Sequence, residues 1–331
     1  MKDSITDVPG ILVGHAQDER AGTGCTVILC GGDIVASVDV RGGAPGTRET
    51  DCLDPSTFIS CVQAIYLGGG SAFGLDGACG VMRFLEEKKA GFDVGVCRVP
   101  IVPGAVIFDL LVGDPLVRPD AAMGLRACRA AGETVAQGNV GAGTGATVGK
   151  AGGISRAMKG GLGTASVSAR DLVVAAIVVV NCYGDIVDPA TGQTVAGALN
   201  EKGDGFAGAL RLIAENPSGG NPFVGNTTIG VVATNARMAK AQAKRVAMMA
   251  HDGYARAINP IHTAHDGDTV FCLATGKVDA DVTVIGSLAA QAMTRAILSG
   301  VKSAASAYGV PGFEEIRART AKGRPESDAL S

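Results

Sequence analysis

The amino-acid sequence predicts an α/β protein in which layered sheets are flanked by helices. Apolar runs of strand length alternate with segments whose apolar residues recur at helical spacing, without the strict strand–helix–strand order of a purely parallel sheet. At 331 residues, with 47% hydrophobic and 18% charged side chains, the chain is globular and can build one large domain or two small ones. Its 49 glycines stand singly and in pairs between the apolar runs, which indicates many tight turns and close backbone approaches.

The N-terminal half begins with three runs typical of strands, at residues 11–13, 26–30 and 34–40. The turn chemistry of Gly31-Gly32-Asp33 predicts that the last two form a hairpin. A polar, glycine-rich loop follows and leads to a short apolar element that ends at Leu67. Two helices are expected next, one from about Ala72 to Lys89 and one that opens at Pro119-Asp120.

The C-terminal half contains the longest uninterrupted apolar run, Leu172 to Val180, which predicts a buried strand ending at Asn181. The other elements expected here are helices at 206–215, 239–254 and 285–296 and strands from 227 and at 269–275. Residues 216–226 have the composition of an exposed linker, and the polar tail from Glu314 is expected to fray.

The composition argues against several classes of partner. The net charge is −3 and the basic residues are scattered, whereas a nucleic-acid surface needs a clustered basic face. The longest apolar run is far too short to span a membrane, and Met1-Lys2-Asp3-Ser4 begins no signal peptide. The nine cysteines form no C-x-x-C pair and mostly lie in apolar runs, as reduced core thiols do. We therefore expect a cytoplasmic protein with no nucleic-acid and no membrane partner.

The first stretch that could carry chemistry is Gly225-Asn226-Thr227-Thr228, a turn that runs into a strand. A threonine hydroxyl is a poor nucleophile without a base, and a free terminal amine, with a pKa of about 7.7–8.0, can be that base. This amine exists only if the Asn226–Thr227 peptide is cut. The Thr227 hydroxyl can cut it by attacking the Asn226 carbonyl to give an ester that water opens. On its own, the stretch is also what an ordinary turn before a strand looks like.

A second stretch places two carboxylates, Asp266 and Asp268, on either side of a glycine just before a strand. They could hold the terminal ammonium of Thr227 and orient its hydroxyl. Because His262 and His265 precede them, the four side chains are also a candidate metal site. A third interpretation is a solvated turn in which the carboxylates accept hydrogen bonds from loop amides.

Three further positions are candidates for a catalytic pocket. Lys150 follows a Gly/Ala-rich run that departs from the phosphate-loop pattern, but it can still lower the pKa of a neighbouring amine or stabilise an anion. Asn181 ends the buried strand, where an amide is usually structural but can also be an oxyanion donor. The turn Gly68-Gly69-Gly70-Ser71 could supply backbone N–H groups or merely pack closely.

Together and in this order, these stretches resemble the self-processing P1-type peptidases, the L-aminopeptidase/D-esterase family, and match best its 6-aminohexanoate-oligomer (nylon oligomer) hydrolase branch. The stretches that carry the resemblance run from Val38 to Ala44, Leu67 to Gly70, Val106 to Asp109, Gly149 to Lys150, Gly225 to Thr228 and Asp266 to Thr269, with Asn181 in addition. The aminopeptidase branch generally uses serine as nucleophile, and a Ser/Glu pair where this chain has Asp266 and Asp268. This difference favours the nylon hydrolase branch.

The resemblance implies a four-layer αββα sandwich of the N-terminal-nucleophile type. It implies that the precursor splits into a large chain, residues 1–226, and a small chain, residues 227–331, which together form one domain. It also implies a homo-oligomer, a tetramer of two-chain units. We expect no cofactor and no bound metal.

The same resemblance implies roles for individual residues. The expected catalytic residues are Thr227, Lys150, Asn181, Asp266 and Asp268, with self-cleavage between Asn226 and Thr227. Phe108, Gly69 and Gly70 are assigned to substrate binding. Phe108 stands where those relatives carry a tyrosine, so a phenolic donor is lost at this position.

The favoured hypothesis is therefore a self-processing N-terminal-threonine hydrolase that cleaves amide bonds in a small or oligomeric amide substrate, as nylon oligomer hydrolases do. An aminopeptidase or β-peptidyl aminopeptidase that acts on short peptides with the same threonine is the alternative. A metal-dependent hydrolase centred on His262, His265, Asp266 and Asp268 belongs to a different class, as does a non-catalytic or acyltransferase relative of the same architecture.

Overall fold

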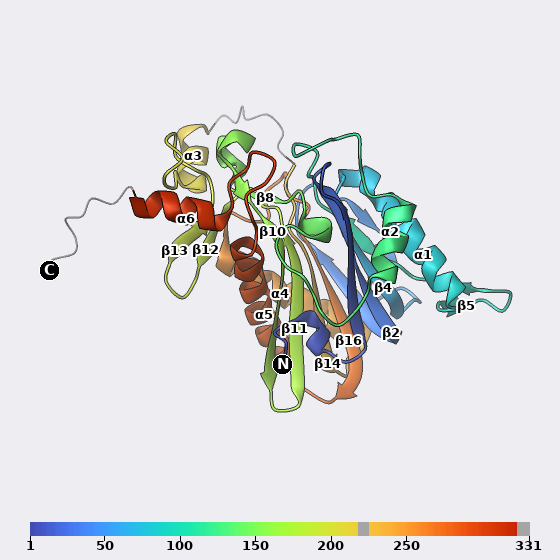
Figure 1. The fold of residues 1–331 in the computed structure, drawn as a ribbon. Helices are drawn as coiled ribbons and strands as arrows, with labels where there is room; N and C mark the ends of the chain where they lie inside the picture. Colours follow the sequence, from blue (N-terminus) through green and yellow to red (C-terminus); the bar gives the residue numbers. More distant parts are fainter. Residues whose placement is uncertain (218–224, 323–331) are drawn as a thin grey trace.

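The chain folds into four layers, with two β-sheets packed face to face and helices on both outer sides (Figure 1). The computed structural model describes residues 1–217 and 225–322. Within them, nine strands form one hydrogen-bonded network, because the long strand β2 (Thr23–Val40) takes part in both sheets. The four-layer αββα arrangement expected from the sequence is confirmed.

The first sheet has the strand order β10-β11-β14-β16-β2. Its strands besides β2 are β10 (Gly161–Ala169), β11 (Leu172–Val180), β14 (Ile229–Ala236) and β16 (Thr269–Val278). All neighbours are antiparallel except β14 and β16, which run parallel with Ile229 opposite Thr269. The segments that lead into these two strands therefore lie side by side at one end of the sheet.

The second sheet is built on the first half of β2, which pairs with β1 and β4. Its strands besides β2 are β1 (Ile11–Asp18), β4 (Cys61–Gly68), β7 (Gly104–Val106) and β3 (Thr47–Arg48). The pairing of β2 with β4 is irregular between Leu29 and Ile34, and beyond this point β2 pairs with β16 of the first sheet. The hairpin predicted at Gly31-Gly32-Asp33 is wrong, because these exposed residues form an irregularity within one continuous strand.

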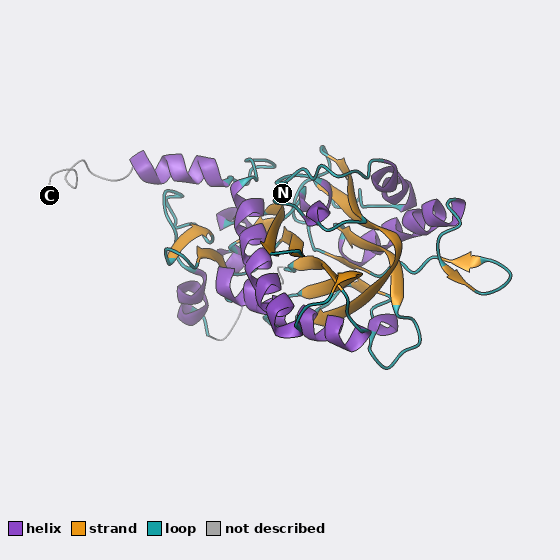
Figure 2. Cartoon of the chain, turned by 90° about the horizontal axis from the view of Figure 1, so that it is seen from below, coloured by secondary structure: helices purple, strands orange, loops and turns teal. Residues whose placement is uncertain are grey.

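Two helices cover the outer face of each sheet (Figure 2). They are α4 (Lys240–Ala257) and α5 (Val282–Lys302) on the first sheet and α1 (Gly77–Glu87) and α2 (Ala121–Arg129) on the second. Within the part of the chain that is described, α5 alone is long and apolar enough to cross a membrane. Here it is a core helix, since its buried residues pack against α4, β10 and β11.

The remaining elements are short. They are the helices α3 (Ala209–Glu215) and α6 (Phe313–Lys322) and the strands β5 (Phe92–Asp93), β6 (Arg98–Val99), β8 (Thr147–Val148), β9 (Met158–Lys159), β12 (Asp185–Asp188), β13 (Gln193–Ala196) and β15 (Ile258–Asn259). Short 3-10 segments lie at Ile5–Asp7, Asp51–Leu53, Ser71–Asp76, Gly141–Gly143, Lys150–Gly152 and Ile154–Arg156. The polar tail from Glu314 does not fray at once, because it forms α6 up to Lys322. Residues 323–331, and residues 218–224 of the expected linker, lie outside the described part.

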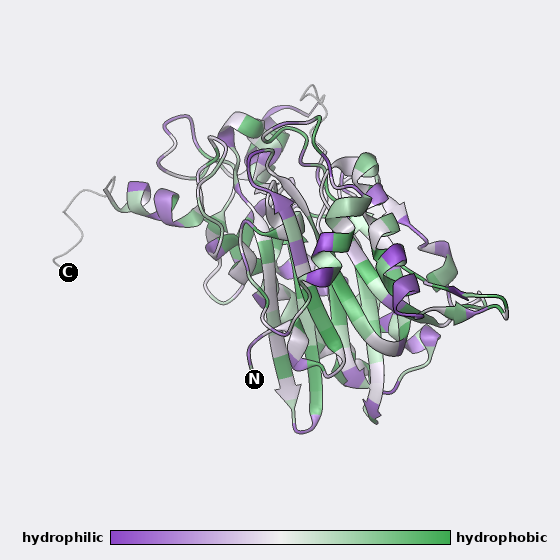
Figure 3. Cartoon of the chain, turned by 45° about the vertical axis from the view of Figure 1, so that its right-hand side comes forward, coloured by the Kyte–Doolittle hydropathy of each residue, from purple (hydrophilic) through white to green (hydrophobic). Residues whose placement is uncertain are grey.

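Three apolar clusters fill the three spaces between the four layers. Because successive side chains of a strand point to opposite faces, one strand serves two clusters. In β11, Ile177 lies between the two sheets, whereas its neighbours Ala176 and Val178 lie under α4 and α5. Burial on both faces explains why the strand is apolar at every position. Figure 3 shows the same pattern as strands that are apolar along most of their length.

Glycines allow the layers to approach closely at particular points. A Cβ at Gly163 of β10 would lie 2.1 Å from the carbonyl oxygen of Ala296 on α5. A Cβ at Gly253 of α4 would lie 2.5 Å from the carbonyl oxygen of Ala290, also on α5. Neither backbone contact leaves room for a side chain, which accounts for part of the high glycine content. All nine cysteines are free thiols.

Candidate active site

The candidate site lies where the parallel strands β14 and β16 begin. The residues before β14, Asn226 to Thr228, run alongside the residues before β16, Asp266 to Asp268. Asn226 forms an isolated parallel bridge with Asp266, and the Thr269 N–H donates to the carbonyl oxygen of Thr228 at 3.1 Å. The two stretches singled out in the sequence, 40 residues apart, are therefore neighbours in the fold.

The hydroxyl of Thr227 is buried against the peptide bond that precedes it. Its Oγ1 donates a hydrogen bond to the carbonyl oxygen of Asn226, and the residue is only 4% exposed. The N–H of Gly267 donates to the same carbonyl oxygen at 3.1 Å and to Thr227 Oγ1 at 3.2 Å. A Cβ at Gly267 would lie 2.7 Å from Thr227 Oγ1. Only glycine therefore fits at this position without moving the hydroxyl.

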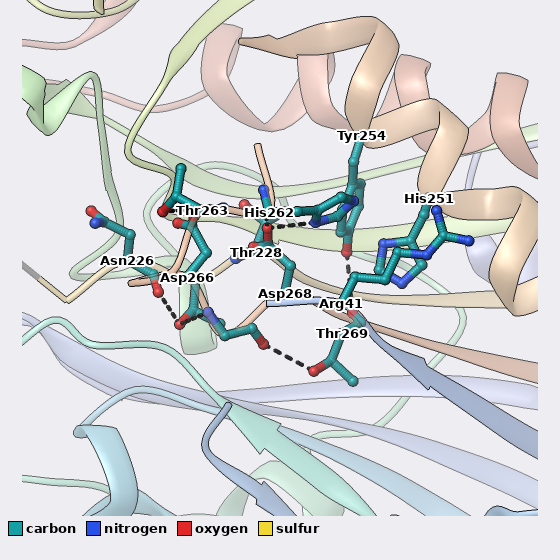
Figure 4. A network of polar contacts seen from close by, with 12 residues as sticks. Arg41, Asn226, Thr228, His251, Tyr254, His262, Thr263, Asp266, Asp268 and Thr269 are labelled. Atoms are coloured by element: carbon teal, nitrogen blue, oxygen red, sulfur yellow. Dashed lines mark hydrogen bonds and ion pairs between the residues drawn. The ribbon is translucent and has the colours of Figure 1, made fainter. Parts of the chain in front are cut away.

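Asp268 connects the start of β14 to the loop that precedes β16 (Figure 4). Its Oδ1 accepts the N–H of Thr228 at 2.7 Å. Its Oδ2 accepts both the backbone N–H of His262, at 3.0 Å, and the ring Nδ1–H, at 2.8 Å. His262 has a φ of +58°, a left-handed conformation that is uncommon outside glycine and that brings both donors to one oxygen. His262 therefore fixes the position of the Asp268 carboxylate, which in turn accepts the N–H of Thr228.

Asp266 is the second buried carboxylate of the site, with no exposed surface. Its Oδ2 accepts the N–H of Thr263 at 2.8 Å and the Thr263 hydroxyl at 2.5 Å. Its Oδ1 is buried without a hydrogen-bond partner. Burial, with the nearby charge of Asp268, raises the pKa of Asp266 to about 6. An acceptor oxygen is therefore available inside the site.

Lys150 and Asn181 lie beside the backbone nitrogen of Thr227. The Lys150 ammonium is buried and donates to Asn181 Oδ1 at 2.9 Å, to the Asn181 carbonyl oxygen at 3.2 Å and to the Thr147 carbonyl oxygen at 3.1 Å. The same Asn181 carbonyl accepts the backbone N–H of Thr227 at 2.8 Å. Lys150 therefore reaches Thr227 through Asn181. Burial lowers the pKa of Lys150 from 10.5 to about 8.

A cavity of about 140 Å³ opens beside Thr227. Phe108 lines it, and the Phe108 carbonyl oxygen accepts a hydrogen bond from Asn181 Nδ2 at 3.1 Å. Gly69 and Gly70 do not line it. Their N–H groups donate instead to the carbonyl oxygen of Gly24, at 2.9 Å, and to Asp109 Oδ1, at 2.6 Å.

The structure brings most of the sequence candidates together. Those that meet around the Asn226–Thr227 peptide are Thr227, Asn226, Asn181, Lys150, Asp266, Asp268 and Phe108. Gly69 and Gly70 are not among the residues that line the cavity, and their assignment to substrate binding stays a prediction. The sequence reasoning missed the N–H of Gly267, and it considered the ring of His262 only as a metal ligand and not as a partner of Asp268. Proximity to Asp268 in the sequence is the available signal for His262, but the same proximity suggests a metal ligand set.

The four residues of the metal-site hypothesis do not converge on one point. His262 donates to Asp268, whereas Asp266 accepts from Thr263, and His265 lines the cavity. Among residues 1–217 and 225–322, no group of three or more such side chains is placed to hold a metal ion. The arrangement is suited to nucleophilic chemistry, because a hydroxyl, a carbonyl and a buried N–H donor meet at one peptide bond.

The raised pKa of Asp266 predicts a pH-dependent stability. The folded chain keeps a proton on this carboxyl up to about pH 6, whereas the unfolded chain releases it near pH 4. This contribution to stability is full below about pH 4 and is lost as the pH rises through 6. A difference of this size corresponds to about 3 kcal/mol. When both proteins carry Thr227→Ala, so that neither has the Thr227 hydroxyl, Asp266→Asn should reduce the fall in unfolding free energy between about pH 4 and 7 by about 2–3 kcal/mol. Denaturant unfolding at a series of pH values measures it, and equal pH dependence of both proteins would contradict the assignment.

Comparison with known proteins places the whole chain in one family. The model of peptidase family S58 matches residues 3–314. An uncharacterized aminopeptidase of Mycobacterium tuberculosis is 45% identical over 345 residues, which cover 95% of this chain and 98% of the relative. A 6-aminohexanoate-oligomer endohydrolase of Kocuria sp. is 32% identical over 89% of this chain and 85% of its own length.

Among solved structures, the L-aminopeptidase D-Ala-esterase/amidase of Ochrobactrum anthropi, described as a variant of the Ntn hydrolase fold, is similar with a TM-score of 0.69. The two are 19% identical, and the match covers 97% of this chain and 94% of that one. The resemblance seen in the sequence is thus confirmed at the level of family and fold. The chain has the Ntn hydrolase fold and is an amide hydrolase that belongs to peptidase family S58.

Proposed function

We propose that this amide hydrolase activates itself by cutting the Asn226–Thr227 bond and then uses Thr227 as its N-terminal nucleophile. The observation that carries the proposal is the contact of the Thr227 hydroxyl with the carbonyl of its own preceding peptide, whose oxygen also accepts the Gly267 N–H. Nucleophile, scissile carbonyl and hydrogen-bond donor are held together before any substrate arrives.

Self-cleavage proceeds in two steps. Thr227 Oγ1 attacks the Asn226 carbonyl carbon, and the hydroxyl proton passes to the Thr227 nitrogen as the carbon–nitrogen bond breaks. The negative charge that forms on the carbonyl oxygen is stabilised by the Gly267 N–H. Water then hydrolyses the ester, which leaves a carboxylate on Asn226 and a free amine on Thr227.

The new amine is held by groups that already surround it. The carbonyl oxygen of Asn181 accepts from the Thr227 nitrogen, and the unpartnered Oδ1 of Asp266 is a second acceptor for an ammonium. The buried cation of Lys150 lowers the pKa of the neighbouring amine, so that it can act as a base near neutral pH. Asp268 fixes the strand through Thr228.

Turnover repeats the same chemistry on an external amide. The Thr227 hydroxyl attacks the substrate carbonyl, its proton passes through the Thr227 amine to the leaving amine, and an acyl ester forms on Oγ1. The side-chain amide of Asn181 is the proposed oxyanion donor. Water then releases the acid and restores the free hydroxyl. No metal or cofactor takes part in the proposed sequence.

The proposed substrate is a linear amide of the nylon-oligomer type, as for the 32% identical endohydrolase. The second candidate is a short peptide cut behind its first residue, which the 45% identical aminopeptidase favours by its name. In both cases we propose a cytoplasmic enzyme that assembles as a tetramer of two-chain units.

The first test is the covalent state of the mature protein. Denaturing mass spectrometry should show two chains of 226 and 105 residues, which together make the 331 of the sequence. Thr227→Ala removes the attacking oxygen and should abolish cutting and amide hydrolysis together. Thr228→Ala is the matched control, because the Thr228 hydroxyl is not the attacking group and cutting should persist. A whole chain with full activity would contradict the proposal.

The second test concerns Gly267. A Cβ at this position would lie 2.7 Å from Thr227 Oγ1 and displace the hydroxyl from the carbonyl it attacks. Gly267→Ala should therefore slow self-cleavage by about 10²-fold or more, since misplacement by about 1 Å costs this much. Gly132→Ala is the control, because a Cβ there meets nothing within 4 Å. Time courses of precursor loss on denaturing gels measure both, and equal rates would show that Gly267 is not part of the cutting machinery.

A further inference from the structure

Lys159 is a second buried lysine near the site, and the proposed reaction makes no use of it. Its side chain has no exposed surface, and its ammonium donates to the carbonyl oxygen of Thr144 at 2.7 Å. Within the described residues this is the single hydrogen bond of the ammonium, which also lies 5.5 Å from the centroid of the Tyr308 ring. A buried charge with so few partners loses more hydration than it regains, so stability alone does not account for a lysine here.

The segment of residues 144–147 connects Lys159 to the site. Thr147 pairs with Lys159 in the short ladder between β8 and β9. The N–H of Thr147 donates to Asn181 Oδ1 at 3.0 Å, and its carbonyl oxygen accepts from Lys150 Nζ at 3.1 Å. Lys159 therefore holds both ends of this segment, through its ammonium and through the ladder. A shift of the segment would move the Asn181 amide and the Lys150 ammonium together.

Asp109 supports the other contact of the same amide. Asn181 Nδ2 donates to the carbonyl oxygen of Phe108, the residue that precedes Asp109. The Asp109 carboxylate is buried and accepts hydrogen bonds from a backbone N–H and a threonine hydroxyl. A Cβ at Gly145 would lie 3.0 Å from Asp109 Oδ2, so the carboxylate packs against the segment that Lys159 holds. Two opposite charges thus stabilise the two stretches of chain that fix the amide.

We propose that Lys159 is a positioning residue for amide hydrolysis, whose ammonium fixes residues 144–147 and thereby holds the Asn181 amide and the Lys150 ammonium in their reactive positions. This inference rests on the proposed function, because it uses the roles given there to Asn181 and Lys150. Lys159 is not among the residues that line the cavity beside Thr227, so it acts through these two side chains.

The charge of Lys159 also affects ionisation in the site. In the described part of the chain, Asp109, Lys150 and the Tyr308 ring are the titratable groups that face it. Burial lowers the pKa of Lys159 from 10.5 to about 7, with the Asp109 carboxylate opposing the shift and the Lys150 ammonium adding to it. Below about pH 7 the ammonium is therefore charged, and it disfavours a proton on the Thr227 amine.

Lys159→Met tests the inference, because it removes the ammonium and keeps an unbranched side chain. The cavity is unchanged, so KM should stay within about twofold, whereas kcat should fall by about tenfold or more as the amide loses its position. The lower limb of the pH profile of kcat should move up by on the order of half a pH unit. Initial rates on a linear 6-aminohexanoate oligomer or on alanine 4-nitroanilide, whichever the wild type hydrolyses, measure both. A wild-type kcat and profile would overturn the inference.

Two further variants show whether the effect comes from the charge at this position. Lys240→Met removes another buried ammonium, which donates to the carbonyl oxygens of Cys52 and Ile59, and should leave kcat and its pH profile as in the wild type. Lys159→Arg keeps a positive charge and should keep the lower limb of the wild-type profile. An equal shift of this limb in Lys159→Arg and Lys159→Met would overturn the inference.

Stability and covalent state separate this inference from a structural role and from the proposed function. Urea unfolding of Lys159→Met should have a midpoint at least as high as that of the wild type, because no charge is buried. A lower midpoint that accompanies the loss of kcat would show that Lys159 is structural. Self-cleavage uses the Gly267 N–H, so mass spectrometry should show two chains in both proteins. A wild type that stays whole contradicts the proposed function, whereas two cut proteins with equal kcat contradict the inference alone.

Discussion

The parallel pairing of β14 with β16 is the constraint on which the site depends. With Ile229 opposite Thr269, the segment that leads into one strand must run beside the segment that leads into the other. A parallel pair cannot be joined by a tight turn, so α4 makes the connection and leaves the first residues of both strands at the same end of the sheet. Both strands are buried on their two faces, between α4 and α5 and the second sheet. The position of Thr227 relative to Gly267 is thereby fixed by the core.

The site is polar although it is buried, and the backbone supplies most of its hydrogen bonds. Lys150 donates to two carbonyl oxygens besides the amide of Asn181, and Asp268 accepts two backbone N–H groups. Backbone partners cannot rotate away, so these charges are held in place before substrate binds. The cost appears as a raised pKa of Asp266 and a lowered pKa of Lys150, both caused chiefly by loss of water.

Much of this fold could be predicted from the sequence, because burial on one or two faces leaves a clear periodic pattern. The apolar run of β11 and the helical spacing in α4 are examples. The path of β2 could not be predicted, since Gly31-Gly32-Asp33 has the local chemistry of a hairpin turn and only long-range pairing decides between a turn and an irregular strand. In the site, the side-chain types at positions 227, 266 and 268 indicated which residues could take part in catalysis. The Gly267 N–H could not be predicted, because every residue except proline has a backbone N–H donor and the sequence does not show where it points. The contact between His262 and Asp268 could not be predicted either, because it depends on the left-handed φ of His262.

The chain's own processing bond indicates where the proposed nucleophile must receive a carbonyl group. In the proposed reaction, the first amide that Thr227 cuts is the Asn226 carbonyl, an internal bond whose acyl residue carries a neutral side chain and no free amine. The same hydroxyl must later attack an external carbonyl from the same side. Gly225 packs against the ring of Phe108 and, with Asn226, forms part of the cavity wall. A substrate that follows the path of this segment places its acyl part against the same apolar surface, so both proposed reactions use the same side of Thr227.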